Sequence, residues 1–145
     1  MELFRLLKKD HERILALLEK VHSLPPERQS RLVALSGELQ EEVDFHLGVE
    51  ERLVYPRLAH IKELQPIILA VKGQHRRIRR LLANQSSKPA MCSAPSLANL
   101  LRQLALHLEE EEELFDEAAE LVEDKLLREI ARDVSGLKRE RIAAN

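Results

Sequence analysis

Apolar residues recur every three or four positions in five stretches of the chain, and this spacing places them along one face of an α-helix. Strands would instead show strict alternation, which none of these stretches has. The pattern therefore predicts five helices, over approximately residues 2–21, 27–55, 66–83, 96–122 and 123–143.

Proline, glycine and polar residues set the expected helix boundaries. Pro56 falls inside the second periodic stretch and is expected to kink or break it, because proline lacks the backbone donor and clashes with the preceding turn. Residues 84–95 are rich in turn formers and read as a long loop, after which Ser96 is expected to cap the next helix. Ser135 and Gly136 are expected to interrupt the last helix, with fraying beyond them.

The composition supports a single all-α domain over residues 1–145. The chain has four Gly, three Phe, one Tyr and no Trp, which favours helix over strand. Its net charge of −2 indicates no general attraction to nucleic acid or to an anionic membrane. It has no run of about 18 apolar residues and no signal-peptide pattern. We therefore expect a cytoplasmic protein, in which the single Cys92 is an incidental loop cysteine.

Polar residues interrupt the apolar faces at positions where a core side chain is expected. Each of the first four helices carries a histidine on its apolar face, and in two of them a glutamate follows four residues later. Residues four apart lie on the same side of a helix, so each such pair directs an imidazole and a carboxylate the same way. The six residues are His11, His46, Glu50, His75, His107 and Glu111.

The same residues suggest an internal repeat. A shift of 64 residues aligns His11 with His75, and a shift of 61 residues aligns the pair His46 and Glu50 with His107 and Glu111. Periodic leucine produces chance matches between helices, but it does not explain matching histidines and glutamates. The chain therefore reads as two helical hairpins, about 2–61 and 66–122, followed by a C-terminal helix, about 123–143.

A packed bundle would bury these six side chains together, and two buried carboxylates require positive charge. Histidines supply little at neutral pH, and no lysine or arginine occupies a central position of the apolar faces. Metal ions would resolve this. Four imidazoles and two carboxylates suit two ions, each bound by two histidines with the glutamates bridging between them.

Other readings apply to the neighbouring residues. Acidic runs usually form a solvated face, which we expect for Glu109, Glu110, Glu112 and Glu113. For His22 and His60, which have no repeat partner, we expect capping or surface roles. The six polar residues on the apolar faces are also compatible with a metal-free helical adaptor protein. In that case they would specify how the helices pair.

The pattern His11, His46-x-x-x-Glu50, His75, His107-x-x-x-Glu111 resembles the hemerythrin-like HHE cation-binding domains. The sequences Glu-Glu-x-Leu-x-Tyr-Pro after His46 and Glu-Glu-x-Leu-Phe after His107 also look like that family. The resemblance implies an up-and-down four-helix bundle, with an additional C-terminal helix here. It further implies a non-haem di-iron centre with an oxo or hydroxo bridge, in which Glu50 and Glu111 bridge and the four histidines are terminal ligands.

One departure bears on function. Oxygen-carrying hemerythrins have a further histidine four residues along the third helix, where this chain has Arg79. The missing ligand leaves a coordination position for dioxygen, nitric oxide or peroxide, in sensing, detoxification or repair. Iron storage or sensing, and a peroxidase or nitric-oxide-reducing enzyme, are the alternatives, and manganese or zinc could replace iron. Arg79 either attracts an anion to the site or, as we expect, pairs with acidic neighbours on a solvated face.

Overall fold

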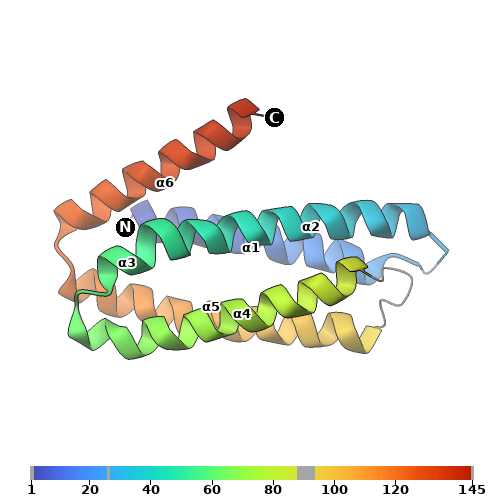
Figure 1. Cartoon of the computed structure of the whole chain (residues 1–145), viewed down its shortest axis with the longest axis horizontal. Coiled ribbons are helices and arrows are strands. Elements are labelled where there is room, and N and C mark those ends of the chain that lie inside the picture. The colour runs from blue at the N-terminus through green and yellow to red at the C-terminus, as the bar shows by residue number, and fades with distance from the viewer. Residues whose placement is uncertain (1, 26, 88–93, 145) are drawn as a thin grey trace.

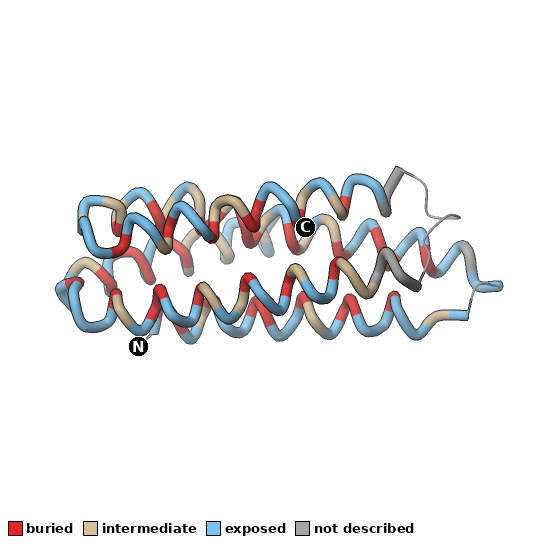
Figure 2. Tube along the Cα trace, turned by 90° about the horizontal axis from the view of Figure 1, so that it is seen from below, coloured by how far each residue is buried: buried red, intermediate tan, exposed pale blue. Residues whose placement is uncertain are grey.

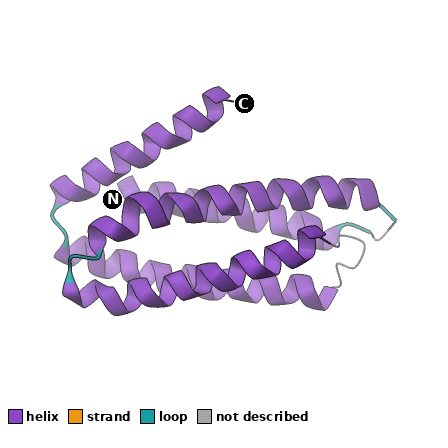
Figure 3. Ribbon diagram, viewed as in Figure 1, coloured by secondary structure: helices purple, strands orange, loops and turns teal. Residues whose placement is uncertain are grey.

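The computed structural model describes residues 2–25, 27–87 and 94–144, and in these ranges the chain is helical with no strand (Figures 1 and 3). Three short segments lie between the long helices α2 and α4. They are the π-helical turn η1 (Glu50–Val54), the short helix α3 (Tyr55–Leu58) and the 3₁₀ turn η2 (Lys62–Leu64). The predicted all-α fold is confirmed. The long helices are α1 (Glu2–Ser23), α2 (Gln29–Val49), α4 (Gln65–Ser87), α5 (Ala94–Leu121) and α6 (Asp124–Ala144).

Four of the long helices form a closed bundle. Helix α1 packs against α2 and α5, and α4 packs against the same two helices, so the four surround a common axis. The four helices run side by side, and α6 diverges from the bundle axis (Figure 1). The buried residues follow the inner faces of the helices (Figure 2). Helix α6 packs on α1 and η1. The faces that the apolar spacing predicted to be internal therefore meet inside the bundle.

The apolar core consists of two clusters. One contains residues from the start of α1, the end of α5 and the buried face of α6, including Phe4 and Phe115. The other contains residues from the opposite halves of the bundle helices, including Ile14, Val43 and Leu104. The buried histidines and glutamates lie between these clusters along the helices. Apolar layers on both sides therefore separate the polar centre from water at either end of the bundle.

The helix is interrupted next to Pro56, as expected, but the interruption begins earlier than predicted. Helix α2 is continued by η1 (Glu50–Val54) and then by α3 (Tyr55–Leu58), with Pro56 in the first turn of α3. The backbone N–H of Tyr55 bonds to the carbonyl of Glu50, five residues earlier. This wider turn interrupts the α-helical hydrogen-bond pattern directly before the proline, and α3 ends at Leu58, two residues after it. The irregularity therefore begins at Glu50 rather than at Pro56.

Three other boundaries were also predicted incorrectly. Helix α6 continues through Ser135 and Gly136, because its buried apolar face outweighs the cost of about 1 kcal/mol for a helical glycine. Helix α4 extends to Ser87, and α5 begins at Ala94, which places Ser96 inside a helix rather than at its cap. Cys92 lies outside the described residues. None of the described helices is long and apolar enough to cross a membrane.

Candidate metal centre

The six polar residues of the apolar faces are all buried in the structure. His11 is on α1, His46 on α2 and His75 on α4, while His107 and Glu111 are on α5. Glu50 is the first residue of the π-helical turn. Each of the four bundle helices therefore contributes a histidine to one interior region.

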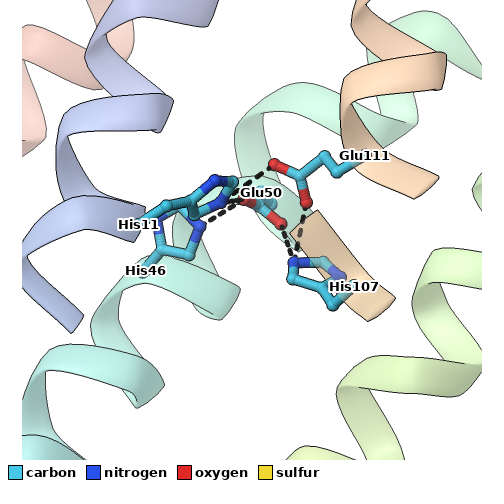
Figure 4. Close-up of side chains that lie close together, drawn as sticks. All are labelled: His11, His46, Glu50, His107 and Glu111. Atoms are coloured by element: carbon cyan, nitrogen blue, oxygen red, sulfur yellow. Dashed lines mark ion pairs between the residues drawn. The ribbon is translucent and has the colours of Figure 1, made fainter. Parts of the chain in front are cut away.

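The side chains of these residues converge. Ligand atoms of His11, His46, Glu50, His107 and Glu111 all lie within 4.8 Å of one another (Figure 4). His75, which Figure 4 does not draw, joins them through Glu50, since its Nε2 lies 3.1 Å from Glu50 Oε2. The structure thus brings together all six residues that the sequence singled out.

The imidazoles form two pairs. The ring centroids of His11 and His46 are 4.5 Å apart, and those of His75 and His107 are 4.7 Å apart. We call these pairs the α1–α2 half and the α4–α5 half of the centre. Each half takes one histidine from each helix of a hairpin, as the predicted repeat would require.

Both carboxylates lie between the two halves. Glu111 contacts His11 Nε2 at 3.3 Å through Oε1 and His107 Nε2 at 2.8 Å through Oε2. Glu50 contacts His46 and His11 (3.5 Å) through Oε1, and His75 through Oε2. Each carboxylate therefore presents one oxygen to each half, which is the arrangement that a bridging ligand needs.

Several atoms of the centre face only one another, and they form no hydrogen bond while the imidazoles are neutral. Among the described residues the buried side-chain atoms without one are mostly in this cluster: the Nε2 atoms of His11, His46 and His107 and one oxygen of each glutamate. Buried polar atoms are rarely left unpaired in folded proteins, because desolvation costs about 1–3 kcal/mol for each. Nitrogen and oxygen atoms that converge without partners are suited to a transition-metal ion.

The electrostatics of the centre depend on the contacts between the carboxylates and imidazoles. Burial by itself would lower the pKa of His46, but the Glu50 carboxylate and the hydrogen bond to Asp10 outweigh it and raise this pKa to about 10. Burial would raise the pKa of Glu50, yet the neighbouring imidazoles hold it well below its usual value. Without metal, protonated imidazoles would therefore balance the carboxylates, contrary to our expectation that histidine supplies little charge here. A metal ion would displace these protons.

Hydrogen bonds orient three of the four imidazoles. His46 Nδ1 lies 3.2 Å from Asp10 Oδ2, and His107 Nδ1 lies 3.2 Å from Gln74 Oε1. His75 Nδ1 lies 2.9 Å from Glu51 Oε1. An acceptor at Nδ1 places the ring proton there and directs the Nε2 lone pair into the centre, as second-sphere partners of metal ligands do.

These acceptors were missed by the sequence analysis, although the repeat contains a signal for two of them. Asp10 directly precedes His11 and Gln74 directly precedes His75, so the 64-residue shift also aligns Asp10 with Gln74. Asp10 is hydrogen-bonded to His46 on α2, and Gln74 is hydrogen-bonded to His107 on α5. The pattern was overlooked because an aspartate and a glutamine share no obvious identity.

Arg79 pairs with an acidic neighbour, as expected. Its Nη1 donates to both carboxylate oxygens of Glu51, at 2.7 and 3.0 Å. Because Glu51 also bonds His75, Arg79 contacts the centre through an acidic residue rather than opening it to an anion.

Tyr55 is a further residue of the centre that the sequence analysis missed. Its hydroxyl lies 2.6 Å from Glu50 Oε2 and 2.9 Å from Glu111 Oε2, so its one proton is shared between the two carboxylates. Burial, together with these charges, raises the pKa of Tyr55 well above its usual value and keeps the phenol protonated. The π-helical turn is what brings Tyr55 back beside Glu50, five residues earlier.

The remaining polar residues follow the expectations. Glu109, Glu112 and Glu113 are exposed, Glu110 is partly buried, and Glu112 lies 3.7 Å from Lys8. His22 and His60 are exposed as well. Of the acidic run on α5, only Glu111 therefore reaches the centre.

A small apolar cavity of about 10 Å³ adjoins the α1–α2 half. Its volume is close to that of one water-sized probe, so it has room for a very small molecule only. His11, His46 and His107 line one side of it, and the other side is aliphatic: Ile14, Leu15, Val43, Leu47, Leu104 and Leu108.

Comparison with known proteins gives one match. Residues 2–119 match the family model described as hemerythrin HHE cation binding domain, which covers the four bundle helices and leaves out α6. The comparisons with curated proteins and with solved structures found no match.

Proposed function

The chain belongs to the hemerythrin HHE cation-binding domain family, and we propose from this premise that its buried centre holds two iron ions and binds a small ligand. The ligand classes are dioxygen, nitric oxide and peroxide. The observation that carries the proposal is the set of converging nitrogen and oxygen atoms that face only one another in a buried site.

Each half of the centre supplies ligands for one ion. His11 and His46 would bind one, and His75 and His107 the other, through their Nε2 atoms. Glu50 and Glu111 would bridge, because each contacts imidazoles of both halves. Bound iron would supply redox chemistry and a position for the small ligand.

The number of donors supports such an open position. The six side chains offer four imidazole nitrogens and four carboxylate oxygens, fewer than two octahedral ions require. The apolar cavity beside the α1–α2 half has room for about one water-sized probe, which is too little for an organic substrate. Asp10, Gln74 and Glu51 would hold the imidazoles in position, and the two apolar clusters would exclude bulk water.

Elemental analysis together with an optical spectrum in air tests the proposal. We expect about two irons per chain and an oxo-to-iron charge-transfer band. A ratio near one would contradict a two-ion centre, and manganese or zinc at full occupancy would change the identity of the metal. A chain that contains no metal, and gains none when Fe(II) is added anaerobically, would instead be a helical adaptor.

Tyr55 favours a second candidate, a di-iron enzyme that reduces peroxide or nitric oxide. Such reactions consume protons, and the Tyr55 hydroxyl is a buried donor in contact with both carboxylates. Its raised pKa means that it would have to regain its proton in the same step, so it would act as a relay to the centre. Positioned proton donors contribute about 100- to 10,000-fold to turnover. We expect Tyr55→Phe to lower kcat of the iron-loaded protein by about 100-fold, with unchanged iron content. Equal turnover by the variant and the wild type would exclude Tyr55 as the donor.

A further inference from the structure

Helix α6 lies outside the part of the chain that matches the family, yet it contacts the centre indirectly. Lys138 Nζ forms an ion pair with Asp10 Oδ1, and the other oxygen of Asp10 lies 3.2 Å from His46 Nδ1. These contacts form a chain of three residues from α6 through α1 to α2. A residue beyond the family domain is therefore one side chain away from a proposed ligand.

The corresponding position in the other half is built differently. Gln74 contacts His107 at the same distance as Asp10 contacts His46, but it offers a neutral amide oxygen. The carboxylate in the other half is Glu51, which bonds His75 and is paired with Arg79. Its side chain is 29% exposed, against 8% for Asp10. Water screens Glu51 more, so Asp10 and Lys138 have the stronger electrostatic effect on the centre.

Other contacts hold α6 in the position from which Lys138 reaches Asp10. Arg141, one turn further on, lies 3.0 Å from Glu42 and packs over the ring of Phe45 at 4.3 Å, both on α2 close to His46. Arg57, on α3, forms an ion pair with Asp133 near the middle of α6. Lys138 is thus placed by the docking of α6.

We propose that Lys138 is a positioning residue of the metal centre, acting through Asp10 on His46, so that α6 sets how strongly the α1–α2 half holds its ion. This inference rests on the proposed metal binding. A carboxylate at Nδ1 makes the imidazole a better donor at Nε2, and the ammonium group of Lys138 offsets part of that carboxylate's charge. Removing the Asp10 carboxylate should therefore weaken metal binding, and removing the Lys138 ammonium group should strengthen it.

The test is titration of the metal-free full-length chain with Co(II), against a competing chelator. For Asp10→Asn we expect one of the two binding steps to weaken by about tenfold, the lower end of the range for second-sphere partners. For Lys138→Met we expect the same step to strengthen severalfold. Arg139→Met is the matched control, since it removes an exposed cation from the next position of the same helix and leaves the docking contacts of Arg141 and Arg57 in place. It should leave both steps within about twofold.

A second measurement needs no metal. The proton on His46 Nδ1 should be visible by NMR in the metal-free protein, because a buried hydrogen bond slows its exchange. We expect its resonance to move upfield in Asp10→Asn, where the acceptor is weaker, and downfield in Lys138→Met, where the carboxylate is less neutralised. Arg139→Met, at an exposed position, should leave it in place.

The outcomes separate this inference from the function on which it rests. Weakened Co(II) binding in both variants would mean that the ion pair only holds the helices together, and would overturn the inference. Unchanged binding in both would also overturn it. A wild-type chain that binds no Co(II) would refute the proposed metal centre itself.

Discussion

Glu111→Ala is expected to abolish stable metal binding. Glu111 presents one oxygen to His11 and the other to His107, so its loss removes a ligand from each half at once. It also leaves the imidazoles of a buried site with one counter-charge where there were two, which disfavours the binding of further positive charge. Metal content after dialysis would measure the effect, and circular dichroism would show whether the helices remain.

Glu112→Ala is the control for this variant. Glu112 is the next residue on α5, but its side chain is 57% exposed and pairs with Lys8 at 3.7 Å. Exposed ion pairs contribute about 0–1 kcal/mol, so this change should leave metal content as in the wild type. Similar losses in the two variants would mean that the acidic run attracts metal as a whole, and that Glu111 is no specific ligand.

Phe115→Ala is expected to destabilise the metal-free protein by about 3–5 kcal/mol. Phe115 is fully buried and stacks on Phe4 with the ring centroids 4.5 Å apart, joining α5 to α1. A loss of this size is a large part of the 5–15 kcal/mol typical of a folded domain. Urea unfolding of the metal-free chain would measure it.

The same substitution is expected to weaken metal binding. Phe115 lies one helical turn from Glu111, and its partner Phe4 lies two turns from His11. The stacked rings therefore hold α1 and α5 together within two helical turns of the centre. Leu121→Ala on the same helix is the control, since Leu121 is 47% exposed and should change stability by about 0.5 kcal/mol or less. Equal destabilisation by the two substitutions would contradict the role of the stacked pair.

Much of the centre was predictable because a helix converts spacing into direction. His46 and Glu50 are four residues apart, as are His107 and Glu111, so each pair had to face one way. Their place among leucines at the same spacing indicated that this direction was inward. The same argument separated Glu111 from Glu112, which differ by about 100° around the helix. The structure places these side chains as the spacing predicted.

The residues that the sequence did not reveal are those whose role depends on a neighbouring helix. Asp10 acts on His46, 36 residues away, and Lys138 acts on Asp10 across 128 residues. No local spacing relates such pairs, because the packing of separate helices decides which side chains meet. Tyr55 was missed for another reason. Its approach to Glu50 depends on the π-helical turn, whereas regular α-helical spacing would place the two residues on different faces.

By itself, then, the sequence determined the fold class, the inward faces of the bundle helices and the six polar residues on them, because all three follow from helical periodicity. The tertiary structure alone decided how the imidazoles pair, which atoms orient them, and that α6 reaches the centre through Lys138. These features arise where helices pack against one another, and the free energy of that packing depends on contacts between residues far apart in the chain.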